Sequence, residues 1–251
     1  MKLRTTLVLT SIAGLLVFLG VLVLYLPASW FGSMLPPQMR CAELGGSLWQ
    51  GECLGLEVQG AKLGDATWNL APGSAIAGRL AGNIDVRGNA SNARADLDLK
   101  FNGTGELRKV AANFPLDPAF VAQFPRDLRG RIVVNLDRAL LADGPALAQL
   151  SGTIELHELR QVGANPLALG SYRVTFDGAT PANGAPVGQL RDLGGPFAIE
   201  GTVTLTPPNS YLVQGLITGR SADAERLVRE ITLGAPPDAS GRSAFSFEGS
   251  Y

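Results

Sequence analysis

The sequence is poor in the side chains that most often build catalytic and metal sites. Its 251 residues include one histidine and two cysteines, so a zinc site made of cysteine and histidine would need nearly all of them. A histidine-dependent hydrolase would have to rely on His157 alone. No phosphate-binding loop, dinucleotide fingerprint or Gly-x-Ser-x-Gly elbow occurs. We therefore expect no enzyme, no metal site and no cofactor.

Charge is scarce as well. Only 17% of the residues are charged, and the formal net charge is −1, which argues against a nucleic-acid-binding protein that relies on a basic surface. Disorder is excluded because 46% of the residues are hydrophobic. Asp85, Asp96 and Asp98 lie at alternating positions, a spacing that favours a solvated strand face over a catalytic pair of carboxylates.

One long apolar run stands near the start of the chain. Residues 7–26 carry no charge, and a helix of this length spans about 30 Å, the thickness of the bilayer core. Lys2 and Arg4 precede the run and the next basic residue is Arg40, which predicts a cytoplasmic N-terminus. A cleaved signal peptide is the competing interpretation, but its apolar core is usually about 7–15 residues long. We expect a single-pass membrane protein composed of a cytoplasmic tail (1–6), a transmembrane anchor helix (7–26), a linker (27–38) and one domain (39–251).

The two cysteines follow this segment closely. The predicted orientation places Cys41 and Cys53 outside the cytoplasm, in an oxidising compartment where a disulfide is expected. Gly45-Gly46 lies between them and predicts a hairpin turn. The bond would then join the two arms of a hairpin.

Apolar and polar residues alternate with period two through the rest of the chain, as in a half-buried antiparallel sheet. A glycine recurs on the apolar side of this pattern, at Gly82, Gly130, Gly152, Gly201 and Gly215. Glycine inside a strand often marks a bend or a close approach of two backbones, so its repetition predicts a sheet that curves toward its apolar face. A second, compatible interpretation is that each glycine makes room for an aromatic neighbour.

Few helices are available to cover the apolar face. Helix signals occur at 117–124 and, more strongly, at Ser221–Ile231, and residues 145–150 could add a turn. The predicted fold class is mainly β: an N-terminal transmembrane helix followed by one long, curved, mostly antiparallel β-sheet domain with two or three short helices. Such a sheet must roll onto itself, pack as two layers or leave an apolar groove for a ligand or partner.

Several short motifs occur in a fixed order along the domain: Gly46–Gly51 (GSLWQG), Trp68–Pro72 (WNLAP), Asp192–Pro196 (DLGGP), Gly201–Leu205 (GTVTL) and Pro237–Arg242 (PDASGR). In this order they resemble the type II secretion system protein N family. The resemblance implies an accessory protein of the Gram-negative inner membrane, with a cytoplasmic N-terminus and a periplasmic domain. It implies partners among the secretion components, either the inner-membrane platform or the outer-membrane secretin, and no catalytic residues.

A weaker similarity supports an alternative. Gly46–Gly51 and Trp68–Leu70 are also similar to the early part of AsmA-like proteins, whose curved sheets form apolar troughs. This similarity implies a lipid-binding or lipid-transfer protein, and the surplus of apolar strand face agrees with it. Both hypotheses lead to the same fold and differ in what occupies the apolar face, a protein or a lipid.

Overall fold

The computed structural model describes residues 14–250 with gaps at 16–17, 19, 36–37, 59, 117–126, 143–145, 164–165, 180–184, 208–209, 233 and 235. Most of the expected anchor (7–26) therefore lies outside the described residues. The described part of this segment up to residue 24 is helical. No helix among the described residues combines the length and the apolar character that crossing a membrane requires. The anchor stays a prediction.

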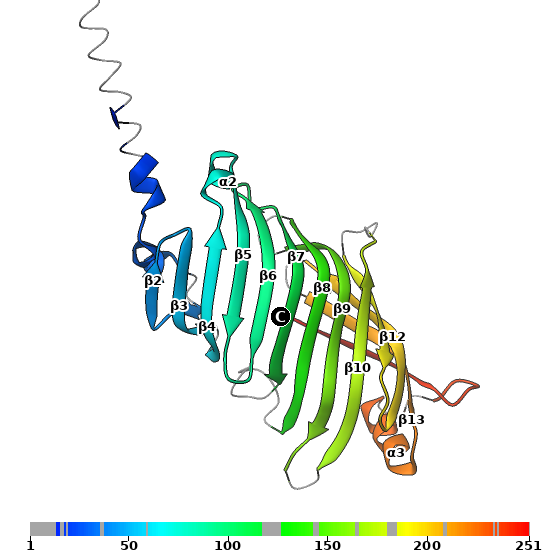
Figure 1. The fold of residues 1–251 in the computed structure, drawn as a ribbon. Coiled ribbons are helices and arrows are strands. Elements are labelled where there is room, and N and C mark those ends of the chain that lie inside the picture. Colours follow the sequence, from blue (N-terminus) through cyan, green and yellow to red (C-terminus); the bar gives the residue numbers. More distant parts are fainter. Residues whose placement is uncertain are drawn as a thin grey trace, which may run out of the picture.

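In the part of the chain that the structure describes, fourteen strands form a single sheet in which every pair of neighbours is antiparallel. From β3 onward the strands follow one another in sequence order, and β1 and β2 both pair with β3 (Figure 1). The strands are β1 (Met39–Arg40), β2 (Glu43–Gly46), β3 (Gln50–Val58), β4 (Ala61–Leu70), β5 (Arg79–Arg87), β6 (Asn92–Lys100), β7 (Gly105–Leu116), β8 (Leu128–Ala142), β9 (Ala146–Gln161), β10 (Leu167–Asp177), β11 (Val187–Asp192), β12 (Phe197–Thr206), β13 (Ser210–Gly219) and β14 (Ser243–Ser250).

Three short helices accompany the sheet in the described part of the chain: the 3-10 helix η1 (Ala28–Met34), α2 (Pro72–Ile76) and α3 (Ala222–Ile231). The expected helix at Ser221–Ile231 is confirmed as α3. Ser221 is its N-cap, and its hydroxyl accepts a hydrogen bond from the Ala224 N–H at 3.2 Å. Ala224 and Val228 are buried, as their helical spacing predicts. The expected helix at 117–124 lies outside the described residues.

Two local predictions are wrong. Residues 146–150, expected to form a helical turn, begin β9 and pair with β8, because the strand ladder satisfies their backbone groups and overrides a weak helical preference. Gly45-Gly46 does not form the hairpin turn but ends β2. The turn instead occupies residues 47–49, where the Ser47 N–H donates to the Gln50 carbonyl at 2.8 Å.

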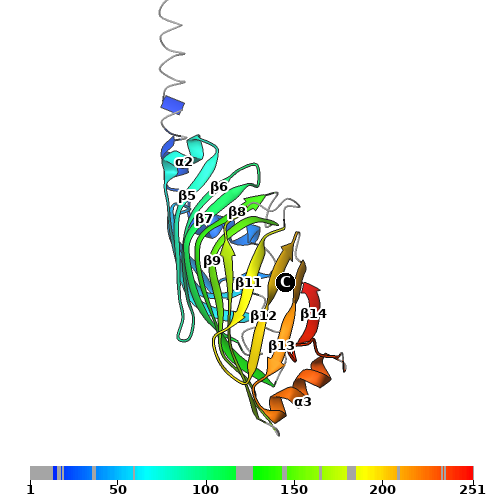
Figure 2. The same ribbon diagram turned by 90° about the vertical axis from the view of Figure 1, so that its right-hand side faces the viewer.

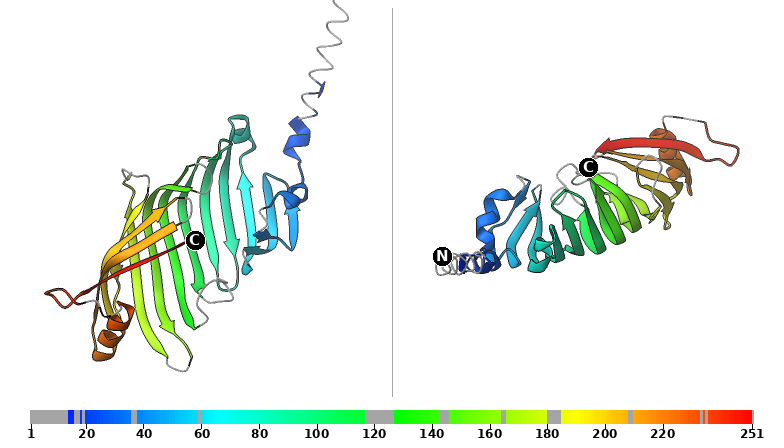
Figure 3. Two further views of the ribbon diagram at one scale, coloured as in Figure 1. Left: turned by 180° about the vertical axis from the view of Figure 1, so that it is seen from behind. Right: turned by 90° about the horizontal axis from the view of Figure 1, so that it is seen from above.

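The sheet is strongly curved (Figures 2 and 3). Leu107 of β7 and Leu205 of β12 pack against one cluster formed by Ala139, Leu150 and Phe176. In a flat sheet β7 and β12 would be about 24 Å apart, because neighbouring strands are spaced by about 4.8 Å. The curl therefore brings distant strands around a common concave face.

The core consists of separate clusters along the sheet. One lies under β3, β4 and β5 and contains Cys53, Leu56, Ala66 and Val86. A second is the cluster that joins β7 to β12. The third packs α3 against β12 and β13. A cavity on the concave face is lined by side chains that pack against the second cluster (Ile154 and Val174) and against the third (Ile199 and Phe245).

Candidate functional site

An apolar trough on the concave face is the candidate binding site. Its cavity has a volume of about 650 Å³, within the usual range for small-molecule sites. Eight consecutive strands, β7 to β14, contribute to it. The lining side chains are aliphatic or aromatic with a single charged exception: Leu116, Ile132, Ile154, Glu155, Leu156, Leu159, Tyr172, Val174, Leu190, Ile199, Val203, Val213, Phe245 and Phe247.

The two polar residues of this lining are both engaged. The Tyr172 hydroxyl donates a hydrogen bond to the Leu169 carbonyl. Burial, followed by the nearby Asp192 carboxylate, raises the pKa of Tyr172 to about 12, so the phenol stays neutral. Glu155 alternates with the lining residues Ile154 and Leu156 and forms an ion pair with Arg173 at 2.7 Å. The trough therefore presents a hydrocarbon wall.

The opposite face of the sheet is polar. Glu155 also contacts His157 at 2.7 Å. Burial opposes ionisation of Glu155, but hydrogen bonds from Arg173 and His157 outweigh it and hold the pKa of this carboxyl below its usual value. The sole histidine thus contacts Glu155 on its own strand, and Glu155 in turn pairs with Arg173 on β10.

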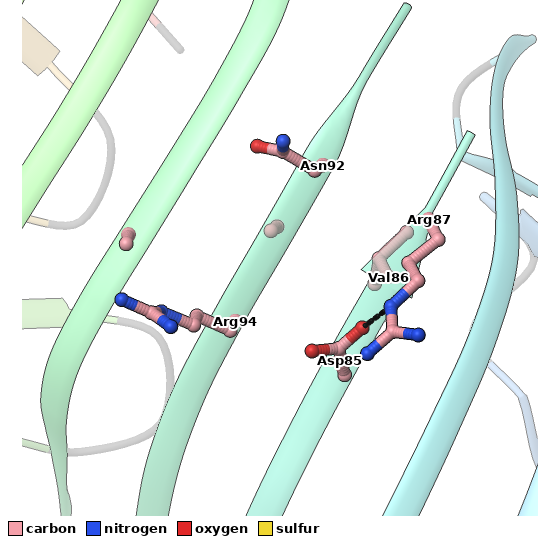
Figure 4. Close-up of a pocket in the computed structure, with 7 residues that line it drawn as sticks. Asp85, Val86, Arg87, Asn92 and Arg94 are labelled. Atoms are coloured by element: carbon pink, nitrogen blue, oxygen red, sulfur yellow. Dashed lines mark hydrogen bonds and ion pairs between the residues drawn. The ribbon is translucent and has the colours of Figure 1, made fainter. Parts of the chain in front are cut away.

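The three aspartates singled out in the sequence also have basic partners. Asp98 pairs with Arg79 at 2.8 Å, and Asp96 with Lys109 at 3.2 Å. Asp85 pairs with Arg87 at 2.6 Å beside a polar cavity of about 400 Å³, and Figure 4 shows both side chains on β5 across from those of β6. Such exposed pairs contribute little to stability. Among the described residues no group of three or more histidine, cysteine or acidic side chains could hold a metal ion.

The Asp192–Pro196 motif lies between β11 and β12, two strands that contribute to the trough. Asp192 accepts hydrogen bonds from the N–H groups of Gly194 and Ile199 and from Arg220, whose Nη2 lies 2.7 Å away. Gly194 and Gly195 both have positive φ, which glycine adopts without strain. Burial raises the pKa of Asp192, but Arg220 and the two backbone donors outweigh it and lower the pKa below its usual value. The carboxylate thus fixes the loop between β11 and β12.

Asp192→Asn should lower the free energy of unfolding by about 2 kcal/mol at pH 7, because a hydrogen bond to a charged group contributes roughly 1.5–3 kcal/mol. Folding lowers the pKa of Asp192, so its contribution is present above the unfolded pKa of about 3.9 and is lost as pH falls below it. Urea denaturation from pH 7 to pH 3 should show the difference shrinking in acid. Asp223→Asn, at a carboxylate that is 84% exposed, should change the stability by less than about 1 kcal/mol. A difference that is independent of pH would contradict this assignment.

The structure places four of the five predicted glycines beside the trough. Gly130, Gly152, Gly201 and Gly215 each lie two residues from a trough-lining side chain on the same strand. At Gly82, Gly152, Gly201 and Gly215 an added Cβ would come within 3.0 Å of the neighbouring strand's backbone, and at Gly130 within 3.2 Å. The nearest atoms at all five are main-chain atoms rather than aromatic rings. That these glycines produce the curvature stays a prediction.

Other glycines, which the strand pattern did not single out, do make room for aromatic rings. A Cβ at Gly51 would collide with the Trp68 ring, at Gly188 with Phe176 and at Gly249 with Tyr211. The Gly46–Gly51 and Trp68–Pro72 motifs therefore meet in space. The Trp68 indole also donates to the Leu48 carbonyl at 2.9 Å.

The turn between β2 and β3 is attached to the N-terminal segment. Trp49 is buried, and its indole donates to the Val23 carbonyl at 2.9 Å. The Leu48 N–H donates to the Leu26 carbonyl at 2.9 Å. The expected disulfide is confirmed: Cys41 and Cys53 are bonded, with their Cα atoms 5.5 Å apart. It connects β3 to the segment just before β2, next to this junction.

The motif order in the sequence agrees with a comparison against protein families. The family model described as type II secretion system (T2SS), protein N, matches residues 37–246, most of the chain. No curated protein and no solved structure is significantly similar. The chain belongs to the type II secretion system protein N family.

Proposed function

We propose that this protein is an accessory component of the type II secretion system that residues 7–26 hold in the inner membrane, with the domain of residues 39–251 in the periplasm. The observation that carries the proposal is the family match over residues 37–246. Lys2 and Arg4 before the apolar run support a cytoplasmic N-terminus. The Cys41–Cys53 bond supports an oxidising compartment for the domain.

We further propose that the domain contacts other secretion components through β14. Within the described residues β14 has a strand neighbour, β13, on one side only. The other edge offers backbone N–H and C=O groups for strand addition, a common mode of protein recognition. Its partner would be the inner-membrane platform or the outer-membrane secretin.

In vivo photo-crosslinking tests this mode of contact. A photo-reactive amino acid at Ser246 or Glu248, both exposed in β14, should crosslink to a secretion component. The same amino acid at Glu200, exposed on β12, which has a strand neighbour on each side, should not. Equal crosslinking from all three positions would contradict strand addition at β14.

Deletion of the gene should lower the amount of secreted enzyme in the medium. Unchanged secretion would contradict the proposed function itself.

The trough supports a second function, the binding of a lipid acyl chain. A peptide strand in the cavity would be surrounded by apolar side chains. Its backbone N–H and C=O groups would then lack hydrogen-bond partners, at a cost of roughly 1–3 kcal/mol for each group. An acyl chain has no groups to pair and can follow a narrow trough.

Leu190→Glu should therefore abolish co-purification of lipid, because it places a carboxylate in the hydrocarbon wall. Gln189→Glu is the matched control: it adds the same charge one residue away, on the opposite face of β11. Native mass spectrometry of the detergent-extracted full chain should find bound lipid in the wild type and in the control alone. A wild-type protein without lipid, or equal lipid in both variants, would exclude this function.

A further inference from the structure

Two exposed apolar side chains lie together at one end of the sheet. After residue 38, Ile76 in α2 and Phe101 in the β6–β7 turn have the highest exposed fractions of the described large apolar residues, 92% and 65%. The Phe101 N–H donates to the carbonyl of Gly78, just after α2, at 3.0 Å. We call residues 72–79 and 100–104, which form these two adjoining loops, the α2 tip. Exposed apolar side chains gathered in one place mark an interaction surface.

The α2 tip adjoins the place where the N-terminal segment enters the domain. Trp49 bonds to the Val23 carbonyl through its indole and accepts the Leu70 N–H at 2.6 Å through its own carbonyl. Pro72, two residues beyond Leu70, begins α2. Figures 1 and 2 both show α2 at the end of the sheet from which the N-terminal segment departs.

This junction has several contacts besides Trp49. Pro27 and Ser47 form a β-bridge, and Leu48 bonds to Leu26. Tyr25 and Trp30 are 76% and 65% exposed and have the aromatic character that membrane interfaces favour. If residues 7–26 cross the membrane, the junction lies at the bilayer surface and brings the α2 tip to the same level.

The charges of the α2 tip suit a lipid surface. It contains Arg79 and Lys100, which are cross-strand partners on β5 and β6, and its sequence has no acidic residue. Asp98 neutralises Arg79, which leaves Lys100, exposed at the end of β6, to face an anionic headgroup. A basic residue near an anionic membrane surface is attracted to it, and apolar side chains beside it can enter the interface.

We propose that the α2 tip is a membrane-contact site at which Ile76 and Phe101 enter the lipid interface beside the anchor. The inference rests on the anchor of the proposed function and adds a second attachment point. Two attachment points prevent the domain from turning freely about the end of the helix. They hold the β4–β6 end of the sheet against the bilayer and leave β14, which lies at the opposite edge of the sheet, where a partner can reach it.

Fluorescence quenching in liposomes tests this site. The full chain is reconstituted, without reductant, in phosphatidylethanolamine and phosphatidylglycerol containing a spin-labelled lipid. Three variants, each with one cysteine added to the disulfide-bonded pair, carry an environment-sensitive probe: Ala77→Cys beside Ile76, Tyr25→Cys at the anchor and Ser240→Cys in the exposed loop before β14. Quenching at position 77 should match that at position 25 and exceed that at position 240 several-fold.

Each outcome decides the proposal. Quenching at position 25 with none at position 77 would show that the anchor exists and the α2 tip does not touch lipid, so that a protein partner must cover it. No quenching at either position would overturn the anchor and the membrane-contact site together. Adding Ile76→Ser and Phe101→Ser to Ala77→Cys should reduce quenching to the level of position 240. Ile231→Ser on exposed α3 should leave it unchanged, and persistent quenching in the double-serine variant would overturn the roles of Ile76 and Phe101.

Discussion

Replacing Gly201 by valine should lower the free energy of unfolding by about 4 kcal/mol or more. Gly201 and Gly215 pair directly across β12 and β13. A Cβ on Gly201 would lie within 3.0 Å of the Gln214 carbonyl oxygen, and one on Gly215 would lie 2.6 Å from the Gly201 Cα. These neighbours are backbone atoms, which cannot rotate away as a side chain can. Valine must therefore push the two strands apart and break the ladder between Phe197 and Thr206.

A graded series checks this expectation. Gly201→Ala should cost roughly half as much as Gly201→Val, because alanine adds the Cβ without the two further methyl groups. Gly73→Ala is the control, since a Cβ at this glycine of α2 meets no atom within 4 Å, and it should leave the stability unchanged or raise it by up to about 1 kcal/mol. Chemical denaturation of the purified proteins gives the three values. A Gly201→Val protein as stable as the wild type would show that the backbones do not approach closely here.

Local periodicity made much of this fold predictable. Ile199, Gly201 and Val203 alternate with polar residues, and period two is sufficient to assign them to one face of a strand. Ser221 followed by apolar residues at helical spacing predicted α3, because both the cap and the face of a helix are encoded within ten residues. The sequence order of the strands also proved to be their order in the sheet from β3 onward, the simplest arrangement for short connections.

The shape of the trough was not predictable in the same way. β-Bulges shift the register beside Lys109 and Glu158, which both have φ near +50°. Nothing in a period-two pattern marks where such an extra residue falls. The Asp192–Arg220 pair joins residues 28 positions apart, and it exists because the β11–β12 loop and the end of β13 meet in three dimensions. Contacts of this kind depend on the curl of the whole sheet.

Opening the Cys41–Cys53 bond should lower the free energy of unfolding by about 3 kcal/mol. The bond joins residues 12 positions apart, and closing a loop of this length reduces the chain entropy of the unfolded state, which destabilises that state by roughly this free energy. Cys53 is buried with Leu56, Ala66 and Val86, so the test uses Cys41→Ser with Cys53→Ala to avoid burying a hydroxyl. Dithiothreitol should lower the denaturation midpoint of the wild type to that of the double variant and leave the variant unchanged. A wild type insensitive to dithiothreitol would contradict a stabilising bond.

The loss of stability should be confined to the strands near the disulfide. The bond fixes β3 beside the turn that carries Trp49, and Trp49 holds the Val23 carbonyl. Amide hydrogen exchange should therefore accelerate in β2, β3 and β4 of the reduced protein, while β8, β9 and β10, which lie several strands away, keep their protection. Uniform acceleration along the whole sheet would mean that the fourteen strands unfold as one unit. A change confined to the first strands would mean instead that the disulfide serves to keep the sheet firmly joined to the segment that precedes it.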